Sequence, residues 1–300
     1  SSKVGRDLSE AIFEEPNNTL KFCEVPEIGI IVEPGVVNDG VGKFVKDIID
    51  VVPDSVDFEK SLKNSGAEIL INLLPVGSDE AVKFYAQSAI NTKIGFINCI
   101  PVFIARDEIW YNKFKENKVP LIGDDIKSQV GATIVHRVLA QLFSDRGVKL
   151  KNTYQLNVGG NMDFLNMLEE DRLETKRTSK TSSVTSVANN GKGIDPDNVR
   201  IGPSDYVKWL EDRKKAFIRL EGESFGGAPL NIEVQLEVWD SPNSAGVTID
   251  AVRYMKFFAE NDDLASLDLV SAWLMKAPAK AYKDSDVLMK LHELTHIENN

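Results

Sequence analysis

The sequence predicts an α/β fold in which an open, doubly wound parallel sheet carries a second, inserted α+β domain. Short and nearly continuous apolar runs at 67–74, 94–100 and 119–122 have the composition of buried parallel strands. Segments with helical spacing of apolar residues separate these runs, as expected where helices connect parallel strands. Later segments at 217–225 and 232–238 alternate between apolar and polar residues, which is typical of a half-buried antiparallel sheet.

The composition narrows the class of protein. Three hundred residues are enough for two compact domains, and an apolar content of 42% is ordinary for a globular chain. The 46 acidic residues outnumber the 35 basic ones, which argues against a nucleic-acid partner. Cys23 and Cys99 are too few for a disulfide framework, which indicates a reducing compartment. Because no apolar run is long enough to span a bilayer and no signal-peptide pattern is present, we expect a cytoplasmic protein without a membrane partner.

The first segment leads directly into a short amphipathic pattern and looks like the interior of a longer chain. Residues 39–44, DGVGKF, come nearest to a glycine-rich phosphate loop. They lack the third glycine and a suitably placed acidic residue, so we interpret them as a turn before a helix at 45–49.

The predicted parallel sheet then follows in order. The strand at 67–74 is followed by a helix for which Ser78 is the expected N-cap, and the strand at 94–100 by a helix at 107–117. Ligands of open α/β sheets bind beyond the carboxyl ends of the strands. Here those ends are Leu74-Pro75, Asn98-Cys99 and Asp124-Asp125.

Residues 124–129, DDIKSQ, are expected to begin an amphipathic helix that ends near Gly147. A helix start at a cleft presents free N–H groups to an anion, and Ser128 would add a hydroxyl and Lys127 a charge. An ordinary N-cap is an equally good interpretation of Ser128. The apolar face of this helix is predicted to comprise Val130, Ile134, Val138 and Leu142.

Histidines offer no metal site by spacing. His136 lies inside the predicted helix without a second His or Cys at ligand distance, so we expect a packed or surface imidazole. His292 and His296 are four residues apart in a charged C-terminal helix, and we do not expect a metal there.

Residues 153–186 collect the densest set of chemically capable groups. A short strand at 154–158 runs into a Gly-Gly turn, and residues 161–163 offer a helix N-terminus that carries an amide and a carboxylate. Asp163 is therefore the first candidate functional residue. Lys176 and Lys180 are four apart among Ser and Thr hydroxyls, which fits either a solvated lysine face or an anion-binding pair.

The remaining chain completes the second domain and returns to the first. Residues 184–198 are interpreted as a flexible polar loop that serves as a lid. A long helix beginning at 240–244 is predicted to pack back on the parallel sheet through Val247, Ala251, Tyr254 and Phe258. Lys276 stands in an apolar setting, where an ammonium either faces a polar pocket or snorkels to solvent, and we favour snorkelling.

The candidate lysines and aspartates of both domains suggest a class of chemistry if they converge at the ends of the parallel strands. Clustered ammonium groups lower one another's pKa, so one lysine can act as a base while another stays charged. That arrangement suits removal of a proton next to a carbonyl, with the enolate oxygen held by an ammonium. The groups in question are Lys176, Lys180, Lys214, Lys276, Asp163 and Asp240.

Several long blocks resemble one family. The segment LNVGGNMDFLNMLE at 156–169, followed by KxxSK, resembles the inositol-1-phosphate synthases of the bacterial and archaeal type. The resemblance continues without gaps in five further blocks, at 74–87, 123–143, 201–214, 236–253 and 273–278.

The resemblance implies a Rossmann-like fold in two parts. An NAD-binding domain would comprise 1–125 and 241–300, and an inserted catalytic and oligomerisation domain 126–240. It also implies a homotetramer. In the family a first strand, a glycine-rich turn and a helix precede the block that begins at Lys3, and this βα unit is missing from the sequence. We expect the natural protein to contain it and the present chain to be a truncated version.

The resemblance further implies a reaction of inositol and phospholipid biosynthesis. D-Glucose 6-phosphate would be oxidised at C5 by NAD, enolised, cyclised by attack on C1 and reduced again to 1D-myo-inositol 3-phosphate. The implied catalytic residues are Lys176, Lys180, Lys214, Lys276 and Asp240. Those near the cofactor are Asp7, Tyr85, Ser128, Asp163 and Lys176, and those near the substrate phosphate are Ser128, Lys180 and Lys214. A cation beside the cofactor phosphates is left open.

Two other functions share parts of this pattern. A different nicotinamide oxidoreductase would have the architecture without the lysine quartet. A non-catalytic sugar-phosphate sensor would bind phosphate without turnover. Conversion of glucose 6-phosphate without net formation of NADH separates the synthase from both.

Overall fold

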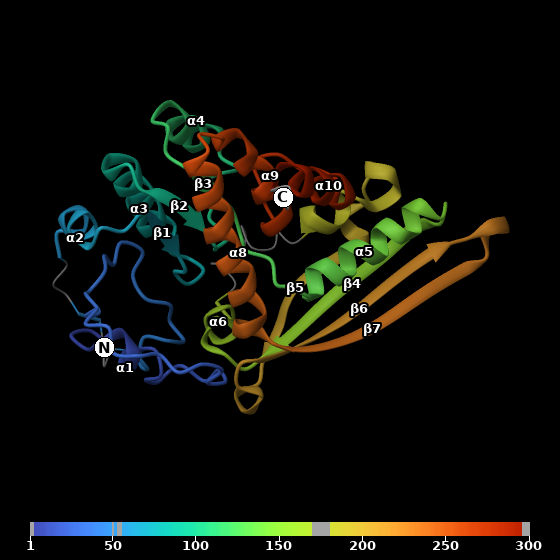
Figure 1. Ribbon diagram of the computed structural model, residues 1–300. Coiled ribbons are helices and arrows are strands. Elements are labelled where there is room, and N and C mark those ends of the chain that lie inside the picture. The colour runs from blue at the N-terminus through green and yellow to red at the C-terminus, as the bar shows by residue number, and fades with distance from the viewer. Residues whose placement is uncertain (1–2, 50, 53–55, 170–180, 296–300) are drawn as a thin grey trace.

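The computed structural model describes residues 3–49, 51–52, 56–169 and 181–295, which form two sheets connected by a long helix (Figure 1). The first sheet contains β1 (Ile69–Asn72), β2 (Gly95–Asn98) and β3 (Leu121–Ile122), all parallel and in that order. The three predicted parallel strands are confirmed, each shorter than its apolar run.

Helices cover both faces of this sheet, because neighbouring residues of a strand point to opposite sides. Phe96 packs with α3 (Asp79–Thr92) and α4 (Glu108–Glu116) in one core cluster. Ile97 packs in another with α8 (Asp240–Glu260), α9 (Leu267–Leu274) and α10 (Asp284–Thr295). The doubly wound, Rossmann-like α/β fold is therefore confirmed.

The second sheet is mixed, with the order β5-β4-β6-β7. Its strands are β4 (Lys149–Gly159), β5 (Val199–Tyr206), β6 (Arg213–Glu223) and β7 (Pro229–Trp239). β4 is parallel to β5 and antiparallel to β6, which is antiparallel to β7. Sequence alternation predicted β6 and β7, and the short β-prone run at 154–158 predicted part of β4. It missed β5, whose IGPSD segment does not alternate.

The helix α5 (Ala132–Asp145) packs on this sheet and corrects one expectation. It begins at Ala132 after the N-cap Gly131, so residues 124–129 precede the helix and Ser128 is not its cap. The side chains that meet the sheet come from the face of Ala140 and Phe143. Val138 and Leu142 of the predicted core face are about half exposed. The helix has apolar residues on two faces, and the pattern selected the outer one.

The first part of the 184–198 segment, through Asn189, is packed against the second domain, which corrects the expectation that the whole segment is a flexible polar lid. Residues 181–185 are helical, and Val184 and Ala188 are fully buried in the core beneath α5. Asn189 donates through Nδ2 to the carbonyl oxygens of Leu150 and Gly193. Two buried apolar residues and one anchoring amide therefore hold this part of the segment in place, despite its polar composition.

The helix α8 joins the two sheets, as Figure 1 shows. It starts directly after β7 and buries Val247, Ala251 and Phe258 against the parallel sheet, as predicted. Its N-cap is Trp239, and the 240–244 segment expected to cap it forms the first helical residues instead. α8 thus runs from the end of the second sheet to the parallel sheet.

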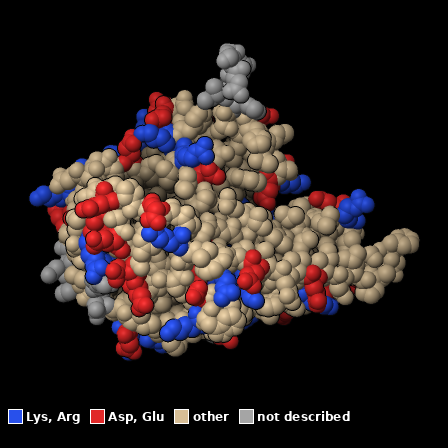
Figure 2. Space-filling model, turned by 60° about the horizontal axis from the view of Figure 1, so that its bottom comes forward, with Lys and Arg blue, Asp and Glu red and all other residues tan. Residues whose placement is uncertain are grey.

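Shorter elements complete the first part of the chain. They are α1 (Leu8–Ala11) and α2 (Phe58–Ser65), with turns instead of the expected helix at 45–49. None of the described helices is long and apolar enough to cross a bilayer. On the face shown in Figure 2, acidic and basic side chains are interspersed.

Candidate active site

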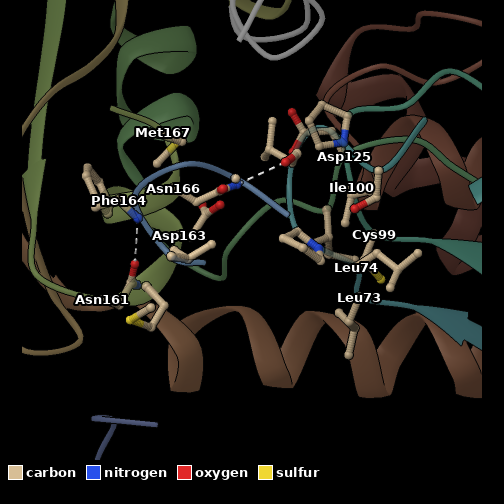
Figure 3. Close-up of a pocket in the computed structure, with 18 of the residues that line it drawn as sticks. Leu73, Leu74, Cys99, Ile100, Asp125, Asn161, Asp163, Phe164, Asn166 and Met167 are labelled. Atoms are coloured by element: carbon tan, nitrogen blue, oxygen red, sulfur yellow. Dashed lines mark hydrogen bonds between the residues drawn. The ribbon is translucent and has the colours of Figure 1, made fainter. Parts of the chain in front are cut away.

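A cavity of about 730 Å³ lies beyond the carboxyl ends of the parallel strands. In Figure 3, Leu74, Ile100 and Asp125 at the strand ends face Asp163 and Asn166 of α6 (Met162–Asn166) across this space. This is the position where open α/β sheets bind ligands.

One wall of the cavity contains a lysine–carboxylate pair. Lys276 Nζ donates to Asp125 Oδ1 at 2.7 Å, and both side chains are mostly buried. The backbones also pair, because Lys276 N donates to the carbonyl of Asp125 at 2.8 Å. The interpretation that Lys276 snorkels to solvent is therefore wrong. An acidic partner at the end of β3 holds the ammonium at the cavity.

Behind this pair lies the fully buried Asp124, which sequence reasoning noted only as a strand end. Its carboxylate accepts from the side-chain amide of Asn98 at 2.7 Å. It also accepts three backbone N–H groups, from Ile104, Ala105 and Arg106, at 3.0–3.1 Å. Burial raises the pKa of Asp124 to about 7, while the donated hydrogen bonds oppose that rise. Asp124 ties the loop after β2 to the segment that presents Asp125.

A second pair joins Lys214 and Asp240, both of which line the same cavity. Lys214 lies opposite Val238 in the β6–β7 register, and Asp240 begins α8 two residues later. The sheet register thus brings the two charges together. Through this contact Asp240 orients the Lys214 ammonium.

Asp212 stands behind the second pair and was also missed. It is 1% exposed and accepts from Thr19 Oγ1 at 2.6 Å and from Asn161 Nδ2 at 2.9 Å. It further accepts from the backbone N–H of Ser241 at 3.0 Å and from its hydroxyl at 2.9 Å. This carboxylate therefore connects the N-terminal segment, α6 and α8.

The Gly-Gly turn places Asp163 at the cavity as the sequence predicted. A side chain at Gly160 would lie 2.5 Å from the carbonyl of Val207, so only glycine fits. Asn161 caps α6 by accepting from Phe164 N at 3.1 Å, and Asn166 Nδ2 donates to the carbonyl of Val76 at 2.9 Å. These bonds, drawn in Figure 3, fix α6 beside the end of β1.

Residues 34–42 also line the cavity, and α3 holds part of this segment. Ser78 is the N-cap residue of α3 but makes no capping hydrogen bond through its side chain. Asp39 supplies the cap instead, accepting from the N–H groups of Glu80 and Ala81 at 2.8 and 2.9 Å. Sequence spacing could not reveal a cap from 40 residues away.

Of the other predicted site residues, some line the cavity and some do not. Ser128 lines the cavity. Tyr85 and Asp7 are not among the residues that line it: the Tyr85 hydroxyl accepts from Val36 N at 3.0 Å, and Asp7 caps α1 by accepting from Ser9 N. Lys176, Lys180 and His296 lie outside the described residues.

Lys127 does not use its ammonium as the sequence suggested. Its Nζ donates to the carbonyls of Ala272 and Trp273 at 2.9 and 3.0 Å, in the last turn of α9. Burial lowers the pKa of Lys127 to about 8. This lysine ties the cavity wall to α9 and is not aimed at an anion.

Metal ligands are not clustered in the described part of the chain, where no group of three or more His, Cys, Asp or Glu could hold an ion. His136 is completely buried, as the packed interpretation predicted. Burial lowers the pKa of His136 to about 4, so the ring is neutral at neutral pH.

The described site therefore combines four predicted charged residues, including Asp163, with one that was not predicted. Lys214, Lys276 and Asp240 line one cavity, and Asp125 completes the pair with Lys276. The available sequence signal for Asp125 was its position after β3. A Rossmann-like fold with lysine–carboxylate pairs at the strand ends defines an enzyme that acts on a small molecule in this cavity.

Comparisons with known proteins identify the enzyme family. A family model described as Myo-inositol-1-phosphate synthase matches residues 131–241. The chain is 56% identical to the inositol-3-phosphate synthase of Mycolicibacterium smegmatis, over 95% of the chain and 79% of that protein. It is 50% identical to that of Corynebacterium glutamicum, with the same coverage. The chain belongs to the myo-inositol-1-phosphate synthase family of enzymes.

Solved structures show the same fold. The chain aligns with a myo-inositol-1-phosphate synthase-related protein from Thermotoga maritima with a TM-score of 0.73 at 24% identity, over 98% of the chain and 83% of that protein. It aligns with an inositol-3-phosphate synthase from Caenorhabditis elegans with a TM-score of 0.71 at 18% identity, over 88% of the chain and 62% of that protein.

Proposed function

We propose that the protein is an NAD-dependent isomerase that converts D-glucose 6-phosphate to 1D-myo-inositol 3-phosphate. The observation that carries the proposal is the pair of lysine–carboxylate contacts facing one cavity, Lys276 with Asp125 and Lys214 with Asp240. Membership of the synthase family supports the choice of substrate.

The cavity is compatible with a nicotinamide cofactor beside a sugar phosphate. It lies at the strand ends of a doubly wound sheet and is bordered by both apolar residues and charged pairs. Ser128 and Asp163 at the cavity, together with Asp7, Tyr85 and Lys176, are the proposed cofactor-binding residues. NAD, when bound, supplies reversible oxidation at C5 of the substrate.

The residues of the chain account for the proton transfers. Once C5 is a carbonyl, the protons on C6 are acidic, and removing one creates an enolate. Lys276, held by the buried Asp125, is positioned to take part in that transfer or to stabilise the oxyanion, together with Lys176. The enolate carbon then attacks the aldehyde carbon C1 and closes the ring.

The second pair is assigned to the phosphate end of the substrate. A lysine ammonium and a serine hydroxyl are good partners for phosphate oxygens. Lys214 and Ser128 line the cavity, and Asp240 fixes the direction of the Lys214 ammonium. Lys180 is proposed to complete this set. Burial of the charged groups keeps water from competing with the substrate.

The proposal includes the organisation of the whole protein. It divides the chain into an NAD-binding domain, 1–125 and 241–300, and an inserted domain, 126–240, that also mediates a cytoplasmic homotetramer. The half-exposed apolar side chains of Val138 and Leu142 on the outer face of α5 support an assembly that covers them. Light scattering after size-exclusion chromatography measures the number of subunits.

A product assay tests the activity. The natural protein that contains this chain is incubated with glucose 6-phosphate and a trace of NAD, and the products are followed by ³¹P NMR and ion chromatography. We expect inositol phosphate to accumulate without net NADH. Stoichiometric NADH would instead indicate another oxidoreductase. Calorimetric binding of the sugar phosphate without any product would indicate a sensor, and either result overturns the proposal.

A further inference from the structure

A row of buried polar side chains lies on the face of β4 that meets α5, where apolar residues would be expected. Thr153, Gln155 and Asn157 occupy alternate positions of the strand and are at most 4% exposed, and His136 reaches them from α5. Gln155 and Asn157 also line the active-site cavity. Burying four polar groups is costly unless they are hydrogen-bonded to one another.

The four side chains form one continuous hydrogen-bond chain. Asn157 Nδ2 donates to the carbonyl of Gly202 at 2.8 Å, and Gln155 Nε2 donates to Asn157 Oδ1 at 3.1 Å. His136 Nδ1 then contacts Gln155 Oε1 at 3.3 Å.

At the other end, His136 Nε2 contacts Thr153 Oγ1 at 2.6 Å. The Thr153 hydroxyl oxygen also lies 2.7 Å from the carbonyl oxygen of Arg219. Backbone carbonyls, which only accept, therefore lie at both ends of the chain.

The Gly202 end fixes the direction of the two amides and of the ring. The carbonyl of Gly202 requires the NH₂ of Asn157, which leaves Asn157 Oδ1 to accept from the NH₂ of Gln155. Gln155 Oε1 then requires a donor. Among these four hydrogen-bonded side chains, His136 Nδ1 is the group that faces it. A neutral ring that carries its proton on Nδ1 meets this demand. The Thr153 hydroxyl has a single proton, which it then donates to Nε2 at 2.6 Å and not to the carbonyl of Arg219.

We propose that His136 is a positioning residue that holds the Gln155 and Asn157 amides in this orientation at the cavity and thereby supports the recognition of the substrate. The chain uses one donor and one acceptor position of each amide, and a primary amide has two of each. The direction of the chain decides where the remaining positions point. This inference rests on the proposed function, because it assigns those positions to hydroxyl groups of the bound sugar phosphate.

Three variants separate this role from ordinary packing. His136→Asn keeps an N–H near the Nδ1 position, His136→Leu removes both ring nitrogens, and Ser144→Ala is the matched control. Ser144 is buried on the same helix and donates to the carbonyl of Val187 at 2.8 Å, outside the chain. All three are compared with the wild-type holoenzyme by steady-state kinetics and thermal unfolding.

The expected signature lies in KM. In His136→Leu we expect KM for glucose 6-phosphate to rise about tenfold, the equivalent of one hydrogen bond, with kcat within about threefold of wild type. His136→Asn should restore KM to within about threefold. Ser144→Ala should lower the unfolding temperature without changing KM. Equal KM values in His136→Leu and wild type would overturn the proposal, and so would the same rise in Ser144→Ala.

A measurement that needs no turnover keeps the two proposals distinguishable. ¹⁵N NMR of labelled histidine, assigned with His136→Asn, reports which ring nitrogen carries the proton. We expect the Nδ1–H tautomer at neutral pH, even if His136→Leu does not fold. A proton on Nε2 would refute the positioning role. Absence of synthase activity in wild type would refute the proposed function instead.

Discussion

Two buried aspartates, one at the end of each sheet, support the two lysine–carboxylate pairs in different ways. Asp124 at the parallel sheet accepts three backbone N–H groups from one loop and one side-chain amide. Asp212 at the mixed sheet accepts side-chain groups of Thr19, Asn161 and Ser241 and one backbone N–H.

Because the donors differ, the two aspartates are expected to control different properties of the protein. A buried backbone N–H that loses its acceptor has no means of turning to water, so its desolvation cost remains. A hydroxyl or side-chain amide can rotate toward another partner. Asp124 is therefore expected to matter first for folding stability, and Asp212 first for the relative placement of α6 and α8 around the cavity.

The largest expected effect comes from Asp124→Ala. Four donors, three of them buried, lose their acceptor at about 1–3 kcal/mol for each buried one, so we expect the free energy of unfolding to fall by about 4 kcal/mol or more. For Asp212→Ala we expect about 2 kcal/mol, because its donors can rearrange. Urea denaturation followed by circular dichroism measures both. Equal losses in the two variants would remove the distinction between the two regions.

The next effect separates the lysines by kinetics. Lys276→Met is expected to lower kcat by about 10²–10⁴ with little change in KM, since the proposed role is proton transfer or oxyanion stabilisation. Lys214→Met should mainly raise KM for glucose 6-phosphate, because a phosphate contact is made in the ground state as well. Steady-state assays of the two variants, with thermal unfolding as a control of the fold, measure the split. Identical signatures would contradict the assignment of the two pairs.

The same two regions show how far sequence reasoning reaches. Lys276 could be named from its motif, but its interpretation as a snorkelling residue was wrong because its partner, Asp125, is 151 positions away in the chain. Apolar runs predicted all three parallel strands, because a strand buried on both faces leaves a local signal. Asp124 left no such signal, since its role depends on a loop about 20 residues upstream that comes into contact only in the folded protein.

In the mixed sheet, the strands in which apolar and polar residues alternate could be predicted from the sequence. The strands without this alternation could not. β6 and β7 alternate clearly, whereas the polar residues of β4 at 153, 155 and 157 point into the core and look like a solvated face. The outer apolar residues of α5 misled the prediction in the opposite direction. Both errors concern which face is inside, which depends on tertiary neighbours that no local pattern contains.

The smallest expected effect tests whether the mixed sheet also depends on a single titrating residue. His136 has a folded-state pKa near 4, below the ordinary value of 6.5, so the unfolded chain binds more protons between these values. The stability that His136 contributes is therefore complete above pH 6.5 and is lost as the pH falls toward 4. Between pH 7.5 and 5.0 the expected loss is about 2 kcal/mol. His136→Asn cannot titrate, so the difference between its unfolding free energy and that of wild type should shrink by this amount on acidification. A difference that stays constant with pH would show that the ring is solvated, and the hydrogen-bond chain on β4 would then be open to water.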